Sequence, residues 1–91
     1  MLKEHILERE KPHHPRNLIG PRLREIRRAA RPRISQEDLC GRVARDAVIL
    51  TRTQIAKIEA GTRPVSDYEL MALAHALSVD LADFFPKRRS R

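Results

Sequence analysis

The stretch Thr51-Arg-Thr-Gln-Ile-Ala-Lys-Ile-Glu-Ala-Gly61 has the signals of a short helix with a cap at each end. The Thr51 hydroxyl can accept from backbone N–H groups of the first turn, and Gly61 can adopt the left-handed conformation that ends a helix. At helical spacing one face carries Ile55, Ile58 and Glu59. The other face carries Arg52, Thr53, Ala56 and Lys57. This donor-rich face fits a helix that enters a DNA groove, and it equally fits a surface helix whose polar side is solvated.

Length and composition indicate one small helical domain. The chain has 91 residues, and its aromatic side chains are Tyr68, Phe84 and Phe85, so the core must be aliphatic, which favours helices. The longest apolar run, 47–50, is too short to span a membrane, and the N-terminus lacks the apolar core of a signal peptide. We therefore expect a soluble, cytoplasmic protein. The single cysteine, Cys40, excludes an internal disulfide, and we expect it to be buried and inert.

The positive charge is concentrated in a few segments. The net charge is +7, with +5 over 17–34, +2 over 51–65 and +4 over 87–91, whereas 66–86 carries −4. One-sided basic charge is the electrostatic footprint of a nucleic-acid binder, although a basic patch can also meet an acidic protein or an anionic membrane.

Apolar spacing and end signals predict five helical segments. The first begins at Gly20-Pro21 and runs toward Pro32. Each later segment follows a residue that can cap it: Ser35, Thr51, Ser66 and Asp80. Because no segment has the alternation or β-branched density of a strand, the sequence predicts an all-α fold.

Two short ends flank the predicted domain. Pro12 and Pro15 separate an N-terminal arm, 1–16, from a domain over 17–86, and 87–91 forms a basic tail. The arm contains His5, His13 and His14. Adjacent histidines before a proline are typical of a polar linker rather than of a metal site, so we expect no metal and no cofactor.

Four stretches share an ordered pattern with a known family. They are Leu23-Arg-Glu-Ile-Arg27, Ile34-Ser-Gln-Glu-Asp-Leu39, Arg52-Thr-Gln-Ile-Ala-Lys-Ile-Glu59 with Gly61, and Glu69-Leu-Met-Ala-Leu-Ala-His-Ala-Leu-Ser-Val79. The chain resembles, over residues 19–85, the Cro and phage-repressor type of helix-turn-helix protein, the XRE-like family. The resemblance implies a compact five-helix, lambda-repressor-like DNA-binding domain that usually works as a dimeric transcriptional repressor and places its third helix in the major groove.

The resemblance also implies roles for single residues. Base contacts are expected from Arg52, Thr53, Lys57 and Gln36. The chemistry agrees, because arginine and lysine donate to guanine O6 and N7 and the threonine methyl can meet a thymine methyl. Phosphate contacts are expected from Ser35, Gln54, Thr62 and Arg63, with Arg45 joining them if its loop faces DNA. Longer-range charge is expected from Arg22, Arg24 and Arg33. Each of these side chains can instead be an ordinary solvated cation or a helix cap.

Arg27 and Glu59 carry a scaffold prediction. In the family, an arginine at the end of the first helix pairs with the glutamate that closes the third, and both stand at matching positions here. Glu59 lies on the apolar face of its helix, where an unpaired carboxylate is costly. The chain departs from the family pattern in two links. Residues 43–50 are longer than the family's tight, glycine-containing turn, so either the second helix is longer or this connection loops outward. Residues 31–33 lengthen the link before the second helix.

The fourth helix has a second, weakly polar face. It carries Tyr68, Met71, Ala72 and His75. A helix that is apolar on most sides needs burial on most sides, and the cover can come from the N-terminal segment or from a twofold-related subunit. We expect a homodimer whose interface contains Tyr68, Met71, His75 and Phe85. The alternative is a partly exposed helix with scattered apolar residues.

These patterns predict a sequence-specific, double-stranded-DNA-binding transcriptional regulator, a dimeric repressor that acts on an inverted-repeat operator. The alternative is a protein-binding module of the same fold, such as an antitoxin or a coactivator-like adaptor. The outer face of 52–59 favours DNA, because it is basic and polar rather than acidic or apolar. An enzyme is not expected, since the sequence holds no Ser/His/Asp grouping, phosphate-binding glycine loop or paired catalytic carboxylates.

Overall fold

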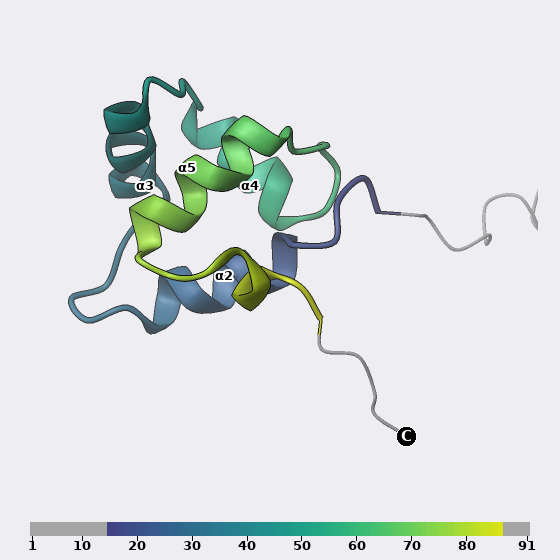
Figure 1. Cartoon of the computed structure of the whole chain (residues 1–91), viewed down its shortest axis with the longest axis horizontal. Coiled ribbons are helices and arrows are strands. Elements are labelled where there is room, and N and C mark those ends of the chain that lie inside the picture. The colour runs from purple at the N-terminus through teal and green to yellow at the C-terminus, as the bar shows by residue number, and fades with distance from the viewer. Residues whose placement is uncertain (1–14, 87–91) are drawn as a thin grey trace, which may run out of the picture.

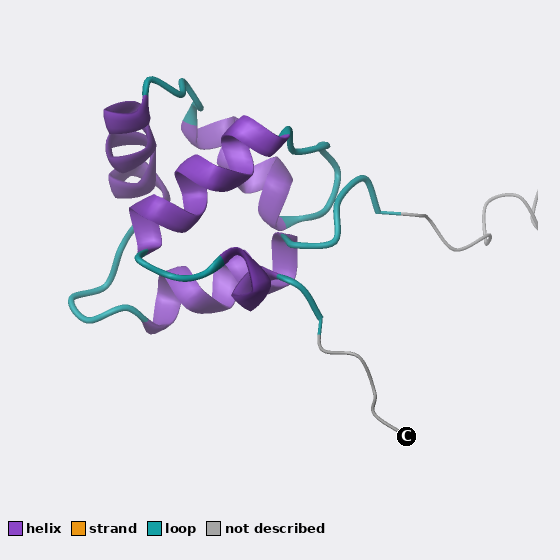
Figure 2. Cartoon of the chain, viewed as in Figure 1, coloured by secondary structure: helices purple, strands orange, loops and turns teal. Residues whose placement is uncertain are grey.

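The computed structural model describes residues 15–86, and these residues form an all-helical domain (Figure 1). The elements are α2 (Gly20–Ala29), α3 (Gln36–Val43), the 3-10 helix η1 (Ala44–Asp46), α4 (Arg52–Glu59), α5 (Asp67–Leu77) and the 3-10 helix η2 (Leu81–Phe84). No strand occurs among residues 15–86, so the all-α prediction is confirmed (Figure 2). The expected fifth helix is the 3-10 helix η2. Most of the predicted arm, with its histidines, and the predicted tail lie outside the described residues.

Three of the four polar caps read from the sequence begin an α-helix, and the fourth, Asp80, begins η2. In α3, α4 and α5 the cap side chain accepts from the backbone N–H three residues on, and the side chain there accepts in return from the cap N–H. The pairs are Ser35 with Asp38, Thr51 with Gln54, and Ser66 with Glu69. Each box satisfies two donors that the helix start would otherwise leave free. Gly61 ends α4 with a φ of +83°, as the left-handed signal predicts.

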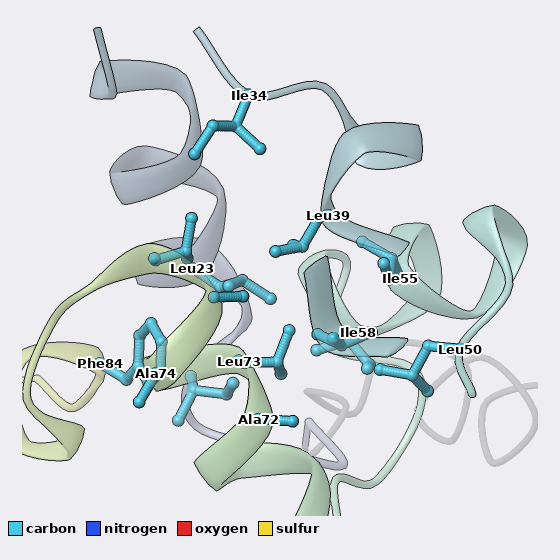
Figure 3. Close-up of a cluster of buried hydrophobic side chains, with 14 residues drawn as sticks. Leu23, Ile34, Leu39, Leu50, Ile55, Ile58, Ala72, Leu73, Ala74 and Phe84 are labelled. Atoms are coloured by element: carbon cyan, nitrogen blue, oxygen red, sulfur yellow. The ribbon is translucent and has the colours of Figure 1, made fainter. Parts of the chain in front are cut away.

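The core lies where the four α-helices meet η2. It contains the fully buried Leu23, Leu39, Val43, Ile55, Ile58, Leu73 and Phe84, several of which point toward one another in Figure 3. α3 packs against both α4 and α5, while α2 packs against α4 and η2. Cys40 is only partly buried at the edge of this core, and burial raises the pKa of its thiol above the usual value. The expectation that this residue is buried was therefore wrong, since it is only partly so.

The start of α2 is fixed against the end of α4 by close backbone contact. A Cβ on Gly20 would collide with the carbonyl oxygen of Ile58 and lie 2.8 Å from that of Glu59. Asn17 reinforces the contact, because its Nδ2 donates to the carbonyl oxygens of Ile58 at 3.1 Å and Arg63 at 2.8 Å. The helix that carries the expected base contacts is thus seated on α2.

The long link between α3 and α4, residues 44–50, is called the connector below. It starts as η1, turns at Ala47 in the left-handed conformation with a φ of 61°, and returns to the core at the buried Leu50. Asp46 Oδ2 lies 2.7 Å from His75 Nδ1, which ties the connector to α5. The extra residues therefore form a 3-10 turn held at both ends, and α3 is not lengthened.

Candidate nucleic-acid interface

α4 presents the two faces that its spacing predicts. Ile55, Ile58 and Glu59 are buried, with at most 2% of their surface exposed. Arg52, Thr53 and Lys57 are exposed. The buried face packs against α2 and α3, so the exposed side chains project from a helix whose position is set by the core.

Glu59 is the centre of a buried polar network. Arg27 donates to both of its oxygens, from Nε at 2.6 Å and from Nη2 at 2.9 Å. Gln36 Nε2 donates to Oε1 at 3.0 Å, and Arg24 Nε approaches the same oxygen at 3.4 Å. Arg27 Nη1 also donates to the carbonyl oxygen of Ile34 at 3.1 Å. The ion pair expected from the sequence is therefore present, and it joins α2, the start of α3 and the end of α4.

The protonation of this network follows from burial and hydrogen bonding. Burial raises the pKa of Glu59, but the hydrogen bonds from Arg27, Gln36 and Arg24 and the charge of Arg27 outweigh it and hold that pKa below the usual value. The hydrogen bond to Glu59 raises the pKa of Arg27. Both groups stay charged, so the pair is an ion pair with supporting donors rather than a neutral contact.

Gln36 is partly buried at the first turn of α3, and the network restricts its amide. A carboxylate only accepts, so the Gln36 nitrogen faces Glu59 and its carbonyl oxygen is the free acceptor. The sequence analysis assigned Gln36 to DNA and did not predict this contact. The expected base-reading role of Gln36 would use an amide whose orientation Glu59 holds.

Beside these residues lies an open hollow of about 520 Å³ between the end of α2, the start of α3 and the start of α4. We call it the arginine hollow, and it is lined by Arg27, Arg28, Arg33, Ser35, Gln36, Glu37 and Arg52. Its lining carries four arginines and one acidic residue, and the N-terminus of α3 adds a partial positive charge. An anion such as a phosphate group suits this place. Arg28 was not among the expected contacts, and Arg33 was expected only as longer-range charge.

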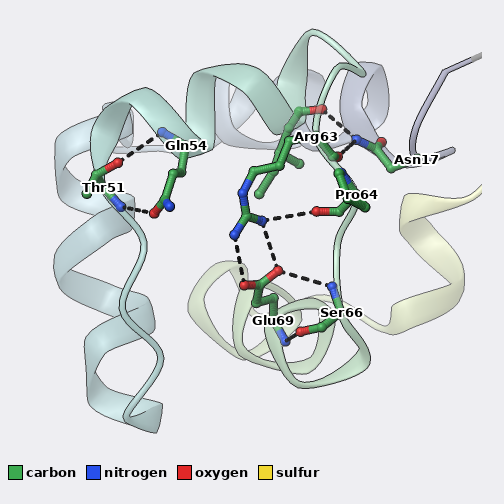
Figure 4. Close-up of polar contacts among 8 residues, drawn as sticks. Asn17, Thr51, Gln54, Arg63, Pro64, Ser66 and Glu69 are labelled. Carbon is green, nitrogen blue, oxygen red and sulfur yellow. Dashed lines mark hydrogen bonds and ion pairs between the residues drawn. The ribbon is translucent and has the colours of Figure 1, made fainter.

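Other expected phosphate contacts lie elsewhere. Arg63 forms two bonds with Glu69, Nη1 to Oε1 at 3.0 Å and Nη2 to Oε2 at 3.1 Å (Figure 4), and this pairing raises the pKa of Arg63. Gln54 serves the α4 cap, where its Oε1 accepts from Thr51 N at 2.9 Å (Figure 4). Thr62 is exposed just beyond α4, and its hydroxyl donates to the Lys57 carbonyl oxygen at 3.3 Å.

Arg45 is separated from this group of residues. It belongs to η1, beyond the C-terminal end of α3, whereas the arginine hollow is at the N-terminal end of α3. There it lines a small hollow with Arg42, Asp46, His75, Ala76 and Ser78. The connector thus places Arg45 outside the lining of the arginine hollow, and its phosphate contact stays a prediction.

Comparisons with known proteins agree with this geometry. A helix-turn-helix family model matches residues 23–84, which include α3, α4, α5 and η2 in full. No curated protein and no solved structure matches the chain. Among residues 15–86, no helix is long and apolar enough to cross a bilayer, and no group of three or more His, Cys, Asp or Glu side chains is placed to hold a metal ion. The chain belongs to the helix-turn-helix family of DNA-binding domains, in its Cro and phage-repressor (XRE-like) form.

Proposed function

We propose that the protein is a sequence-specific transcriptional regulator that places α4 in the major groove of double-stranded DNA. The observation that carries this proposal is the division of α4, in which Arg52, Thr53 and Lys57 are exposed while the opposite face is buried. Arginine and lysine can donate to guanine O6 and N7, and threonine can contact the thymine methyl. Because the opposite face of α4 packs against α2 and α3, the helix can present these groups at a fixed angle.

The arginine hollow supplies the second part of the proposal. Arg52 lines it together with Arg28, Arg33 and Ser35, so a group bound there lies beside the start of α4. A backbone phosphate seated in the hollow would position the first turn of α4 over the base edges, since phosphate contacts set register while base contacts read sequence. Arg28 and Arg33 therefore replace Arg63, whose charge is paired, as the main phosphate contacts.

We infer further that the protein acts as a dimeric repressor on an inverted-repeat operator. This step is supported by the family resemblance and by the exposed apolar side chains of α5. A twofold dimer would bring two copies of α4 to two half-sites that mirror each other.

Selection from randomised double-stranded DNA tests the proposed function. The wild-type protein should enrich one motif, and Arg52→Ala should lose the preference at one base position while weakening its binding by about 1–3 kcal/mol. Arg28→Ala should weaken all sequences alike and reduce the slope of log affinity against log salt by about 1. Arg22→Ala is the matched charge control, because Arg22 pairs with Glu25 and lies outside the lining of the arginine hollow, so its loss removes only longer-range charge and should weaken binding less than Arg28→Ala does.

The same selection separates the proposal from the alternative of a protein-binding module. If the wild-type protein enriches no motif and binds random DNA with no loss in Arg52→Ala, α4 does not read bases. Capture of a protein partner by the outer face of α4 would then become the better explanation of the fold.

A further inference from the structure

An exposed apolar groove lies between the connector and α5, on residues that the proposed DNA contacts do not use. It has a volume of about 390 Å³ and is lined by Asp46, Val48, Asp67, Tyr68, Met71 and Ala72. Tyr68 is 81% exposed, Met71 is 47% exposed, and Ile49, next to Val48, is 79% exposed. Several large apolar side chains in one exposed region are typical of an interaction surface. We call this surface the connector groove.

We propose that the connector groove is the interface with a second copy of this chain, with the two α5 helices antiparallel. The inference rests on the proposed dimer and assigns its surface. On α5, Asp67 and His75 stand about one helical turn before and after Met71. In a twofold interface centred on Met71, the Asp67 end of one copy meets the partner's His75 end.

The groove itself is lined by two acidic residues, Asp46 and Asp67, and by no basic one, and the complementary charge lies in an adjoining hollow. At the His75 end, Arg42 and Arg45 outnumber Asp46, and these side chains line a common hollow of about 160 Å³. At the other end, Asp67 begins α5, and the nearby Glu69 is already neutralised by Arg63. The twofold arrangement therefore brings Asp67 toward the partner's Arg45, and it does so twice in each dimer. A surface that is acidic at one end and basic at the other suits a copy of itself.

The connector makes this interface specific to the chain. Arg45 and Ile49 both belong to the residues that lengthen the link before α4, and the contact of Asp46 with His75 holds the link against α5. Phe85 follows η2 and is not part of the groove lining. The proposed interface therefore uses Tyr68 and Met71 from the groove lining and His75 from the adjoining hollow, whereas Phe85 lines neither.

A charge exchange tests the pairing directly, with the full chain and without DNA. Arg45→Asp places two acidic residues opposite each other in a homodimer, and Asp67→Arg places two basic ones there. Each single variant should raise the dimer dissociation constant, measured by sedimentation equilibrium, by about tenfold or more. An equimolar mixture of the two variants should form heterodimers, and the double variant should dimerise like the wild type, because both restore opposite charges.

Control variants separate the interface from folding and from DNA binding. Tyr68→Asp should give a folded monomer, whereas Leu18→Asp should leave the dimer intact, since Leu18 is 63% exposed and outside the groove lining. Circular dichroism checks that each variant is folded. A wild-type dimer that tolerates Tyr68→Asp and both charge changes would overturn the inference, as would a wild-type monomer. Either result leaves the proposed DNA function standing if the motif selection succeeds, and failure of that selection leaves the dimer measurement unaffected.

Discussion

At the scale of single residues, Glu59 couples stability to the placement of the side chains proposed to contact DNA. Its carboxylate accepts hydrogen bonds from Arg27, Gln36 and Arg24, which belong to two other helices. Glu59→Gln leaves the charge of Arg27 buried without its counterion, so the free energy of unfolding should fall by about 3–5 kcal/mol in urea titrations. Glu25→Gln is the matched control, because Glu25 forms an exposed pair with Arg22 and its loss should cost less than about 1 kcal/mol.

The same carboxylate predicts how stability depends on pH. The pKa values of Glu59 and Glu69 lie below their usual value of 4.5. For Glu59, burial raises the pKa, but the hydrogen bonds that its carboxylate accepts outweigh this effect. For Glu69, the main cause is the hydrogen bonding from Arg63. The unfolded chain then binds protons first as pH falls, so the stabilisation is complete above pH 4.5 and is lost as pH drops through the folded pKa values. Unfolding free energies measured from about pH 6 to pH 3 should decrease, and Glu59→Gln should make the decrease shallower. An equal slope in the variant would remove Glu59 from this role.

Residues also show where sequence reasoning stops. Arg27 and Glu59 could be paired from the sequence, because an acidic residue on an apolar helix face needs a partner. Arg63 was expected at a phosphate because its charge alone was visible, and its two bonds to Glu69 depend on how the turn before α5 folds. Arg28 was not predicted as a contact, because its place in the arginine hollow also depends on how separate segments fold together. The run of arginines before the Ser35 cap was the available signal for it.

At the scale of elements, local rules predicted the helices well and the links poorly. Ser35, Thr51 and Ser66 mark helix starts because a cap acts within its own first turn. For the connector the sequence left two alternatives, a longer α3 or an outward loop. Its path depends on the burial of Leu50 and on the contact of Asp46 with His75. These are long-range contacts that spacing along one helix does not reveal.

The packing of α2 on α4 gives a prediction with a built-in control. Gly20→Ala places a methyl group against the carbonyl oxygens of Ile58 and Glu59, so α2 must shift and the free energy of unfolding should fall by about 2 kcal/mol or more. Gly41→Ala meets no atom within 4 Å on α3 and should raise it by about 0.5–1 kcal/mol through helix propensity. Urea titrations compare the two variants. A harmless Gly20→Ala would show that the contact between α2 and the end of α4 is not tight.

At the scale of the whole molecule, the candidate site is an assembly of segments. The arginine hollow joins residues of α2, the link after it, α3 and α4, and no single stretch of sequence predicts that they meet. The division of α4 was predictable because both faces belong to one helix. The sequence could therefore single out α4 and its exposed face before the structure, while the proposed phosphate site beside it required the fold.

The proposed dimer predicts a fixed spacing between its two half-sites on DNA. If two copies join through a twofold interface, their α4 helices reach two half-sites whose centres are about 34 Å, or roughly one helical turn, apart. Inserting about 5 base pairs between the half-sites turns one of them to the opposite side of the duplex, so affinity should fall toward that of a single half-site. Inserting about 10 base pairs restores the facing but stretches the separation, and a rigid dimer should recover little affinity. Mobility-shift titrations of the three operators measure this, with the charge-exchange variant Arg45→Asp as the control. Because Arg45→Asp should weaken the dimer, the affinities of this variant for the three operators should be nearly equal. If the variant instead prefers the native spacing as strongly as the wild type does, the dimer does not depend on the connector groove.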